Sequence, residues 1–550
     1  MPWPSTWRAP PAAGGDADVA ADGGDADRAE AAGEVQLPAA VSRLVLSAQE
    51  DLRREIARAM HDGPAQSLTN IVLQAQIVER LVARDPASAS GEIRQLTAMV
   101  QQTLDATKSF IFDVRPMVLD DLGLVPTLRR AARERGRLVY KLGERLMERA
   151  DEVARLETLH NGKPIFEARQ IEIPAAAECL QYFAGWADKL HGETVPVKGH
   201  YFTYTLREPL GVCAAIVPWN FPLLLAIWKV APALAMGNTM ILKPASQTPL
   251  TALAFADICR EVGLPPGVLN VITGGGGSVG QAVVEHPGID KIAFTGDTST
   301  GKGIMKTAAD TLKKITLELG GKSANIVLAD ADVDAALRGA TTGIFYGKGE
   351  VCAAGSRLLV DTSLKNEFID KLAARTKKMV PGDPLDPKTR LGAIASKGQL
   401  ERVLQYVATA QKEGGTLVAG GARADIGTGK GYFMQPTVFA DVTSSMTIAR
   451  EEIFGPVLAA IEFADIDEAI ATANASEYGL AAAVWTKDIK KAHYVARKLQ
   501  AGTVWINTYN IYDTAAPFGG YKQSGFGREM SVHALEHYTQ VKSVWVDLNQ

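Results

Sequence analysis

Apolar side chains recur at helical spacing between residues 42 and 133. Two such stripes flank the break DPASASG: Leu68, Ile71, Ala75 and Val78, then Ile93, Leu96 and Val100. Spacings of three and four residues place side chains on one face of a helix. The pattern predicts two long helices in an antiparallel hairpin. We expect its apolar stripes to be covered by a second copy, as in a dimeric four-helix bundle.

The pattern changes from about residue 135, where short β-rich runs alternate with helical segments. The runs are GVCAAIVPW, NTMILKP, GVLNVIT, KIAFTG and KSANIVLA, separated by segments such as LTALAFADICREVG and SVGQAVVEH. This alternation predicts βαβ units on a parallel sheet, an α/β fold. The apolar stretch 210–242 is interrupted by Pro218, Pro222, Lys229 and Pro232. It is therefore predicted to form a buried strand, a loop and a buried helix, and no membrane span.

Composition adds limits to this picture. The 550 residues are 47% hydrophobic and 22% charged with a net charge of -4, which indicates neither a nucleic acid nor a membrane as partner. Residues 1–38, rich in Ala, Asp, Gly and Pro, are expected to be disordered. No secretory signal precedes the helices. The cysteines lie far apart, which predicts a cytoplasmic protein with no disulfide framework and no metal site: Cys179, Cys213, Cys259 and Cys352.

One cysteine, Cys352 in GKGEVCAAGSR, lies between glycine-bearing turns. A thiol nucleophile needs access, donors for the oxyanion that it creates, and a base for hydrolysis of its acyl intermediate. Asn220 in PWNFP is a candidate donor held between prolines, and Glu318 in LELGGKSAN is a candidate base. The loop FTGDTSTG leads from a strand into a helix and could bind a phosphate. Taken singly, these residues could equally be a buried thiol, a turn residue and a surface charge.

Seven motifs occur in order along the chain: VPWNFP, KPASQTP, FTGDTSTG, LELGGKSAN, GEVCAAGSR, EEIFGPV and PFGGYKQSGFGRE. In this set the region from about residue 134 to the C-terminus resembles the NAD(P)-dependent aldehyde dehydrogenase superfamily. The resemblance implies a Rossmann-type cofactor domain at 134–318, with an oligomerisation β-hairpin near 190–210. It also implies an α/β catalytic domain at 319–505 and a C-terminal segment, 506–550, that completes the active site and a small β oligomerisation element. A homodimer or homotetramer is expected.

The resemblance also implies roles for individual residues in the oxidation of a small-molecule aldehyde to a carboxylic acid. Cys352 would attack the aldehyde, Asn220 would hold the oxyanion, and Glu318 would activate water to hydrolyse the thioester. Lys229 and Glu529 match a pair that relays protons from the site.

The same resemblance assigns a site for NAD or NADP as cofactor. Its expected residues are Trp219, Lys243, Gly296, Glu452 and Phe454. Aromatic residues are expected to line the substrate tunnel, although each of them could instead be an ordinary core aromatic: Phe221, Trp228, Tyr512 and Phe518. Since no Arg or Lys stands out among them, apolar aliphatic or aromatic aldehydes are favoured over anionic semialdehydes.

The sequence departs from the family pattern at several positions. Ser246 replaces a Glu that would repel a 2′-phosphate, so NADP is expected to be accepted as well as NAD. Asp297 replaces a Ser in the phosphate loop and is expected to cap the following helix. Glu350 replaces a Gln, and Gly347 an Asn; a carboxylate at 350 would be expected to raise the pKa of the thiol. Family members carry roughly 70 residues before residue 134, and loss of their outer strands would expose a sheet edge.

The N-terminal helices carry a second resemblance. The stretches RREIARAMHDGPAQSLTNIV and FIFDVRPMVLDDLGLVPTLRR resemble the dimerisation and phosphoacceptor domain of sensor histidine kinases, over residues 42–133. By this resemblance His61 is the phosphoacceptor, with Asp62 and Gln66 beside it; otherwise it is an ordinary polar helix residue. No matching ATP-binding domain follows. The alternative function is therefore a dimerising signalling module whose dehydrogenase-like part is inert.

Overall fold

The structure, a computed structural model, describes residues 60, 65–114 and 124–549. The chain divides into two compact units, Met1–Gly123 and Leu124–Gln550. The predicted disordered tail at 1–38, the helical positions up to residue 59 and His61 lie outside the described residues. The structure therefore does not test what the sequence predicts for these residues.

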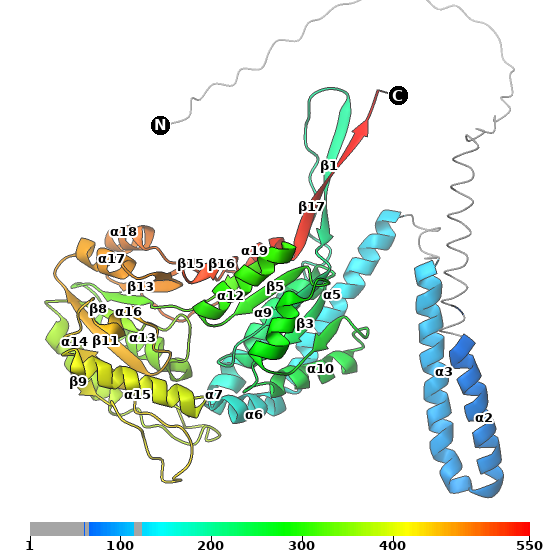
Figure 1. Cartoon of the computed structure of the whole chain (residues 1–550), viewed down its shortest axis with the longest axis horizontal. Helices are drawn as coiled ribbons and strands as arrows, with labels where there is room; N and C mark the ends of the chain where they lie inside the picture. The colour runs from blue at the N-terminus through cyan, green and yellow to red at the C-terminus, as the bar shows by residue number, and fades with distance from the viewer. Residues whose placement is uncertain (1–59, 61–64, 115–123, 550) are drawn as a thin grey trace, which may run out of the picture. The chain divides into compact units, whose positions relative to one another are not determined.

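The described part of the first unit, residues 60 and 65–114, contains two antiparallel helices, α2 (Gln66–Arg84) and α3 (Pro86–Val114) (Figure 1). The predicted helical hairpin is confirmed, but its connection is shorter than the predicted break, because only Asp85 is non-helical. Pro86 begins α3, where a missing backbone N–H does not cost a helical hydrogen bond. The Asp85 carboxylate accepts hydrogen bonds from the backbone N–H of Ser88 (3.3 Å) and from its hydroxyl (2.7 Å).

Apolar side chains on both helices are exposed, with 46–56% of their surface accessible: Leu68, Val72, Leu73, Ile77, Val82, Ile93, Val100 and Leu104. A helix pair with this much exposed apolar surface is typical of an interaction element.

The second unit begins with a long helix and contains two large sheets. In the first sheet the strand order is β16-β6-β5-β2-β3-β4, with β2 to β6 parallel and β16 antiparallel to β6. Their bounds are β2 (Val212–Ile216), β3 (Thr239–Lys243), β4 (Leu269–Val271), β5 (Lys291–Thr295), β6 (Lys314–Glu318) and β16 (Gly525–Phe526). Strands β2 to β5 lie in predicted β-rich runs, so the predicted parallel βαβ arrangement is confirmed.

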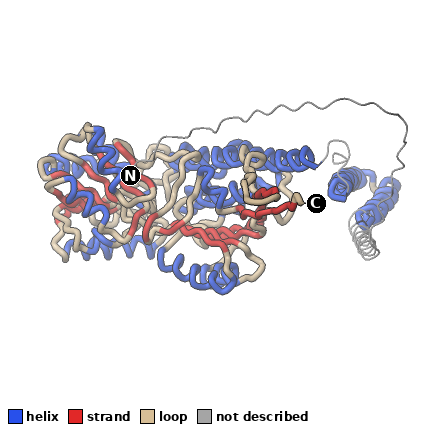
Figure 2. The backbone as a smooth tube through the Cα atoms, turned by 90° about the horizontal axis from the view of Figure 1, so that it is seen from above, coloured by secondary structure: helices blue, strands red, loops and turns tan. Residues whose placement is uncertain are grey.

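Helices cover both faces of this sheet (Figure 2). Cys213 and Ala215 of β2 pack in one apolar cluster, and Ala214 between them packs in another. The first cluster includes α8 (Ile173–Ala184), α9 (Pro222–Ala235) and α10 (Leu250–Val262); the second includes α11 (Gln281–Glu285) and α12 (Thr298–Ala308). Alternation at every second residue is what a strand buried on both faces requires. The stretch 210–242 forms a buried strand, a loop and a buried helix, as predicted.

The chain passes to the second sheet between Glu318 and Ala324, where the sequence predicted a domain division. This sheet has the order β14-β13-β7-β8-β11-β10-β9, parallel except for β9. The strands are β7 (Ala324–Val327), β8 (Arg357–Asp361), β9 (Thr416–Ala419), β10 (Thr437–Ala440), β11 (Val457–Phe463), β13 (Ala481–Trp485) and β14 (Thr503–Ile506). The main helices are α13 (Val333–Phe345), α14 (Lys365–Thr376), α15 (Lys397–Lys412), α17 (Ile466–Asn474) and α18 (Ile489–Lys498).

Strands β1 (Tyr201–Pro209) and β17 (Thr539–Asp547) pair antiparallel along their whole length and project from the rest of the second unit (Figure 1). Thr194 forms a bridge with Tyr204, which makes a short hairpin within the predicted range 190–210. The C-terminal segment thus returns to the start of the unit. On the way it adds β15 (Tyr521–Lys522), β16 and α19 (Ser531–Glu536).

Helices α5 (Leu124–Glu148) and α6 (Ala150–Asn161) precede the first sheet. Helix α5 runs without interruption across residues 133 and 134, where the sequence placed a boundary. Within residues 60, 65–114 and 124–549, we find no helix with the length and apolar character that a membrane crossing needs.

Candidate active site

Cys352 follows a tight turn after α13. Gly347, Lys348 and Gly349 have φ angles of 56°, 62° and 70°, in the left-handed region. A Cβ at Gly349 would lie 2.2 Å from the carbonyl oxygen of Gly455, so only glycine fits there. The turn leaves Cys352 partly exposed, whereas the other three cysteines of the chain are buried.

A cavity of about 150 Å³ lies beside Cys352, at the carboxyl ends of β2, β5 and β6. Its lining includes eight of the residues that the sequence singled out: Trp219, Asn220, Gly296, Asp297, Glu318, Cys352, Glu452 and Phe454. Open α/β sheets bind ligands in the crevice outside the carboxyl ends of their strands. Residues that are far apart in the sequence thus meet where such a fold provides a binding site.

Electrostatics in the cavity keep the thiol protonated. Burial and the negative charges of Glu318 and Glu452 raise the pKa of Cys352 well above its usual range. Burial also raises the pKa of Glu318 to about 7, against the opposing charge of Lys229. Neither carboxylate oxygen of Glu318 has a hydrogen-bond partner of ordinary geometry. A carboxyl group with a pKa near 7 can accept a proton at neutral pH, which suits a general base.

The side chain of Asn220 is held by the loop that carries the thiol. Its Nδ2 donates to the backbone carbonyl of Glu350 (2.9 Å), 130 residues later. A side-chain amide has two N–H donors, so one remains for another acceptor. Its Oδ1 is buried without a hydrogen-bond partner.

Lys229 lies fully buried on α9, and its Nζ is 3.0 Å from Oε1 of Glu529. Its charge also acts on Glu318, whose pKa it lowers against the larger effect of burial. The structure therefore brings the predicted relay pair together and places it near the candidate base.

Lys243 and Ser246, two of the predicted cofactor residues, lie at the carboxyl end of β3, on the same edge of the first sheet. Lys243 ends β3, and its Nζ donates to the Pro244 carbonyl (3.1 Å), which leaves two of its three donors. Ser246 is exposed, and its hydroxyl donates to the Gly274 carbonyl (2.9 Å). The Lys243 ammonium and the hydrogen-bonding groups of the cavity fit a ligand with ribose hydroxyls and an amide, as a nicotinamide dinucleotide has.

Asp297 caps α12, as predicted. Its carboxylate accepts from the backbone N–H groups of Ser299 (2.9 Å) and Thr300 (3.1 Å). Cap formation satisfies N–H groups that otherwise end a helix unpaired. These two groups are therefore engaged by the protein itself rather than free for a phosphate.

Glu452 and Phe454 form the far wall of the cavity. Oε1 of Glu452 accepts from the Gly321 backbone N–H (2.8 Å), and burial raises the pKa of Glu452 to about 7. Phe454 has a φ of 59° and meets the Trp219 ring edge-on, with centroids 5.3 Å apart.

Sequence reasoning missed Gln399 and Arg402, which line the same cavity from α15. Gln399 Nε2 donates to the Phe454 carbonyl (2.6 Å), and Arg402 Nη2 donates to the Glu452 carbonyl (3.2 Å). Their spacing of three residues places both on one helix face. Nothing in the sequence of α15 indicates that this face turns toward the thiol.

The predicted tunnel aromatics do not line this cavity. Trp228, Tyr512 and Phe518 form a cluster, with Phe518 5.6 Å from Trp228 and 5.5 Å from Tyr512 between ring centroids. Phe221 stacks instead on Tyr346, 6.1 Å away. Phe221 and Phe518 also belong to the apolar core.

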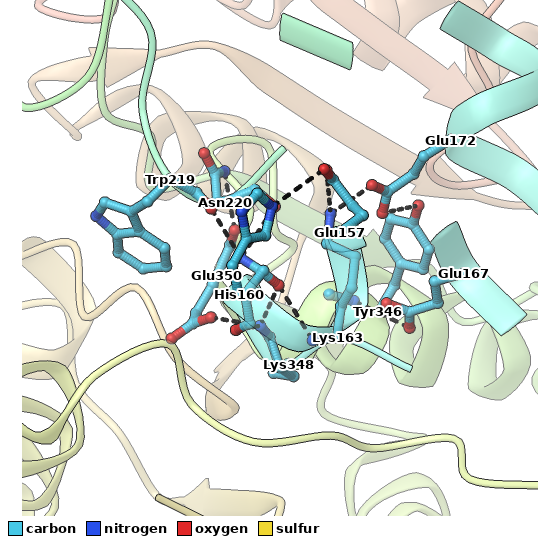
Figure 3. A network of polar contacts seen from close by, with 12 residues as sticks. Glu157, His160, Lys163, Glu167, Glu172, Trp219, Asn220, Tyr346, Lys348 and Glu350 are labelled. Carbon is cyan, nitrogen blue, oxygen red and sulfur yellow. Dashed lines mark hydrogen bonds and ion pairs between the residues drawn. The ribbon is translucent and has the colours of Figure 1, made fainter. Parts of the chain in front are cut away.

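Glu350 does not act on the thiol as the sequence suggested. Its carboxylate lies 2.9 Å from the Lys348 ammonium and accepts from the Ala395 backbone N–H (3.0 Å) (Figure 3). The carboxylates that raise the pKa of Cys352 are Glu318 and Glu452. The prediction was wrong because the Glu350 carboxylate points toward the buried Lys348 ammonium, although Glu350 is close to Cys352 in the sequence.

Comparison with known families gives two matches. Residues 127–544 match the aldehyde dehydrogenase family, and residues 53–119 match a histidine kinase family. The second match includes His61, which lies outside the described residues.

Individual relatives agree with the first match. Human mitochondrial aldehyde dehydrogenase is 48% identical over 426 residues, 77% of this chain and 82% of that protein. Mouse retinal dehydrogenase 2 is 49% identical over 421 residues, 76% of this chain and 80% of that protein. The NAD+ complex of aldehyde dehydrogenase from Bacillus cereus has a TM-score of 0.75 and 50% identity, covering 76% of this chain and 84% of that one.

Proposed function

The chain belongs to the aldehyde dehydrogenase family, and we propose that it oxidises apolar aldehydes through a thiohemiacetal and a thioester on Cys352. The observation that carries this assignment of residues is the shared cavity of Cys352, Asn220 and Glu318. A nucleophile, an oxyanion donor and a base are the three groups that acyl chemistry of this kind requires.

Acylation begins with attack of the Cys352 thiolate sulfur on the aldehyde carbon, which forms a C–S bond and leaves an oxyanion. Because burial and two carboxylates raise the thiol pKa, only a small fraction is thiolate at neutral pH. The free N–H of the Asn220 amide stabilises the oxyanion. Such a donor contributes about 3 kcal/mol to the barrier reduction in other enzymes. Collapse of the oxyanion expels hydride and leaves the thioester.

Hydrolysis uses Glu318. Its carboxylate takes a proton from water, and the resulting hydroxide attacks the thioester carbon. The C–S bond then breaks, and the product departs as a carboxylate after giving its acid proton to the Cys352 sulfur. We propose that the proton on Glu318 leaves by way of the Lys229–Glu529 pair, whose charged atoms lie 3.0 Å apart and whose charges act on Glu318.

Bound NAD+ or NADP+ supplies the hydride acceptor. We propose that Lys243 and Ser246 hold its adenosine end, with Gly296 and Asp297 beside the pyrophosphate. Trp219, Glu452 and Phe454 would surround the nicotinamide end. Two observations support this arrangement. Trp219, Lys243, Ser246, Gly296 and Asp297 follow or end strands on one edge of the first sheet, whereas Glu452 and Phe454 precede β11 of the second sheet. All of them except Lys243 and Ser246 line the cavity of the thiol. Phe221, Trp228, Tyr512 and Phe518 are proposed to form an apolar approach to it.

Purified protein is expected to form reduced nicotinamide from apolar aldehydes such as hexanal or benzaldehyde. The kcat/KM for these aldehydes should exceed that for succinic semialdehyde by about tenfold or more, since no partner for its carboxylate is recognised among the proposed approach residues. Initial rates of absorbance increase measure both. Absence of turnover with every aldehyde would reject the proposal in favour of an inert dehydrogenase-like part.

Ser246 is expected to let the protein use both cofactors. The ratio of kcat/KM with NAD to that with NADP should stay below about a thousandfold, because a serine hydroxyl does not repel a 2′-phosphate. Ser246→Glu should raise this ratio about tenfold or more through like-charge repulsion. Steady-state kinetics with both cofactors measure it. A wild-type preference for NAD beyond a thousandfold, or an unchanged ratio in the variant, would contradict the role of Ser246.

We further propose a cytoplasmic homodimer or homotetramer. The arm of β1 and β17 supports self-association, because it exposes large apolar side chains: Tyr201, Phe202, Leu206, Val541, Trp545 and Val546. Four free thiols support a reducing compartment.

A further inference from the structure

We infer that Lys348 is a positioning residue that locks the Asn220 amide and the Cys352 loop into one arrangement. This inference rests on the proposed function of Asn220 as oxyanion donor. It assigns a role in the reaction to a ring of buried polar contacts beside that donor. Lys348, Asn220, Glu350 and Trp219 of this ring are labelled in Figure 3, and hydrogen bonds of Asn161 complete it.

The ring begins at the ammonium of Lys348, a side chain that is only 1% exposed. Its Nζ donates to two oxygens of Asn161, the backbone carbonyl (3.1 Å) and Oδ1 (2.7 Å). It also pairs with Oε2 of Glu350 at 2.9 Å. One cation therefore joins the end of α6 to the turn before the nucleophile.

The two partners of Lys348, Asn161 and Glu350, each form a hydrogen bond at the proposed oxyanion site. Asn161 Nδ2 donates to the Trp219 carbonyl (2.7 Å), which fixes the backbone just before Asn220. The backbone carbonyl of Glu350 accepts from Asn220 Nδ2 (2.9 Å), which fixes the side chain. Asn220 is thus held at its backbone by one arm of the ring and at its amide by the other, and Lys348 closes the ring.

The backbone at Lys348 indicates that this arrangement is held by contacts. Lys348 has a φ of 62°, a conformation that is strained for a residue with a side chain and persists only where the surroundings fix it. The strained residue lies four positions before Cys352. A change in its contacts would therefore be transmitted directly to the nucleophile loop.

Charge explains why the ring depends on both ionised members. Burial lowers the pKa of Lys348 and raises that of Glu350, and the charge of each opposes the shift of the other. Removal of one member leaves a buried unpaired charge, which is more damaging than removal of both. Two other buried groups act on this pair: Lys163 on both members, and Glu167 on Lys348.

The test compares three variants of the full chain: Lys348→Gln, Glu350→Gln and the double variant. Lys348→Gln is expected to lower kcat about 10- to 100-fold, as displacement of a reacting group by about 1 Å does. The dissociation constant of NADH, from fluorescence titration, should change less than about twofold. The double variant should recover to within about fivefold of wild-type kcat, because two neutral amides can restore the ring without an unpaired charge.

Lys365→Gln is the matched control. Lys365 begins α14, forms ion pairs with Asp441 and Glu462, and does not line the cavity. Its kcat should equal that of the wild type. Unchanged kcat in folded Lys348→Gln, or a double variant no faster than the single one, would overturn the inference. If Lys348→Gln does not fold, Asn161→Ser opens the ring with both charges kept; loss of kcat would then support the inference and unchanged kcat would overturn it. An inactive wild-type protein would reject the proposed function itself, and this inference with it.

Discussion

Cys352→Ala is expected to lower kcat for aldehyde oxidation by about 10⁴-fold or more, the scale on which removal of a nucleophile acts in other covalent mechanisms. Without the sulfur, neither the thiohemiacetal nor the thioester can form, and the cavity offers no second thiol. Binding of NADH should persist, because the proposed cofactor residues remain in place. Steady-state rates and fluorescence titration on the same preparation separate the two effects.

Cys259→Ala is the matched control for this substitution. Cys259 is buried on α10 and does not line the cavity of about 150 Å³. The control should lose some stability through the small void that it leaves, with kcat unchanged. More than about 1% residual activity in Cys352→Ala would rule out Cys352 as the nucleophile, because such activity is far above what the remaining groups supply.

Sequence patterns predicted the first sheet well, for a physical reason. Strands buried on both faces read as short apolar runs, so β2, β3 and β5 stood out against the amphipathic helices between them. Glu318 ends β6, and Asn220 lies in the loop that follows β2. Polar residues at the carboxyl ends of parallel strands share one edge, which is why residues 98 positions apart lie in one cavity.

The sequence did not predict the contacts that depend on tertiary structure. Glu350 was expected to act on Cys352 because it lies two positions before it, but the left-handed turn at Lys348 and Gly349 directs its carboxylate to Lys348. Lys348 itself reads as a solvated charge in the sequence. Its partner Asn161 is 187 residues earlier, and no pattern in the sequence around either residue predicts that contact. Gln399 and Arg402 were not identified as cavity residues for the same reason, since the sequence of an amphipathic helix does not indicate which cavity its polar face lines.

Glu318→Gln is expected to separate the two halves of the reaction. Steady-state turnover should fall about 10²- to 10³-fold, because an amide cannot take the proton from water during thioester hydrolysis. The Cys352 thiol should become more reactive, because the charge of Glu318 raises its pKa in the wild type. Stopped-flow absorbance should therefore show a burst of about one reduced nicotinamide per site before the slow phase. Iodoacetamide should alkylate the variant faster than the wild type at pH 7.

The pH dependence supplies an independent check on this base. The pKa of Glu318 lies at about 7, and only the deprotonated carboxylate accepts a proton, so wild-type kcat should rise as pH increases through that value. Glu318→Gln should lose this rise, whereas Glu367→Gln, at an exposed position on α14 paired with Lys371, should keep it. If the variant kept the rise, or if its turnover and alkylation rates fell together, Glu318 would be a structural neighbour of the thiol and some other group would hydrolyse the thioester.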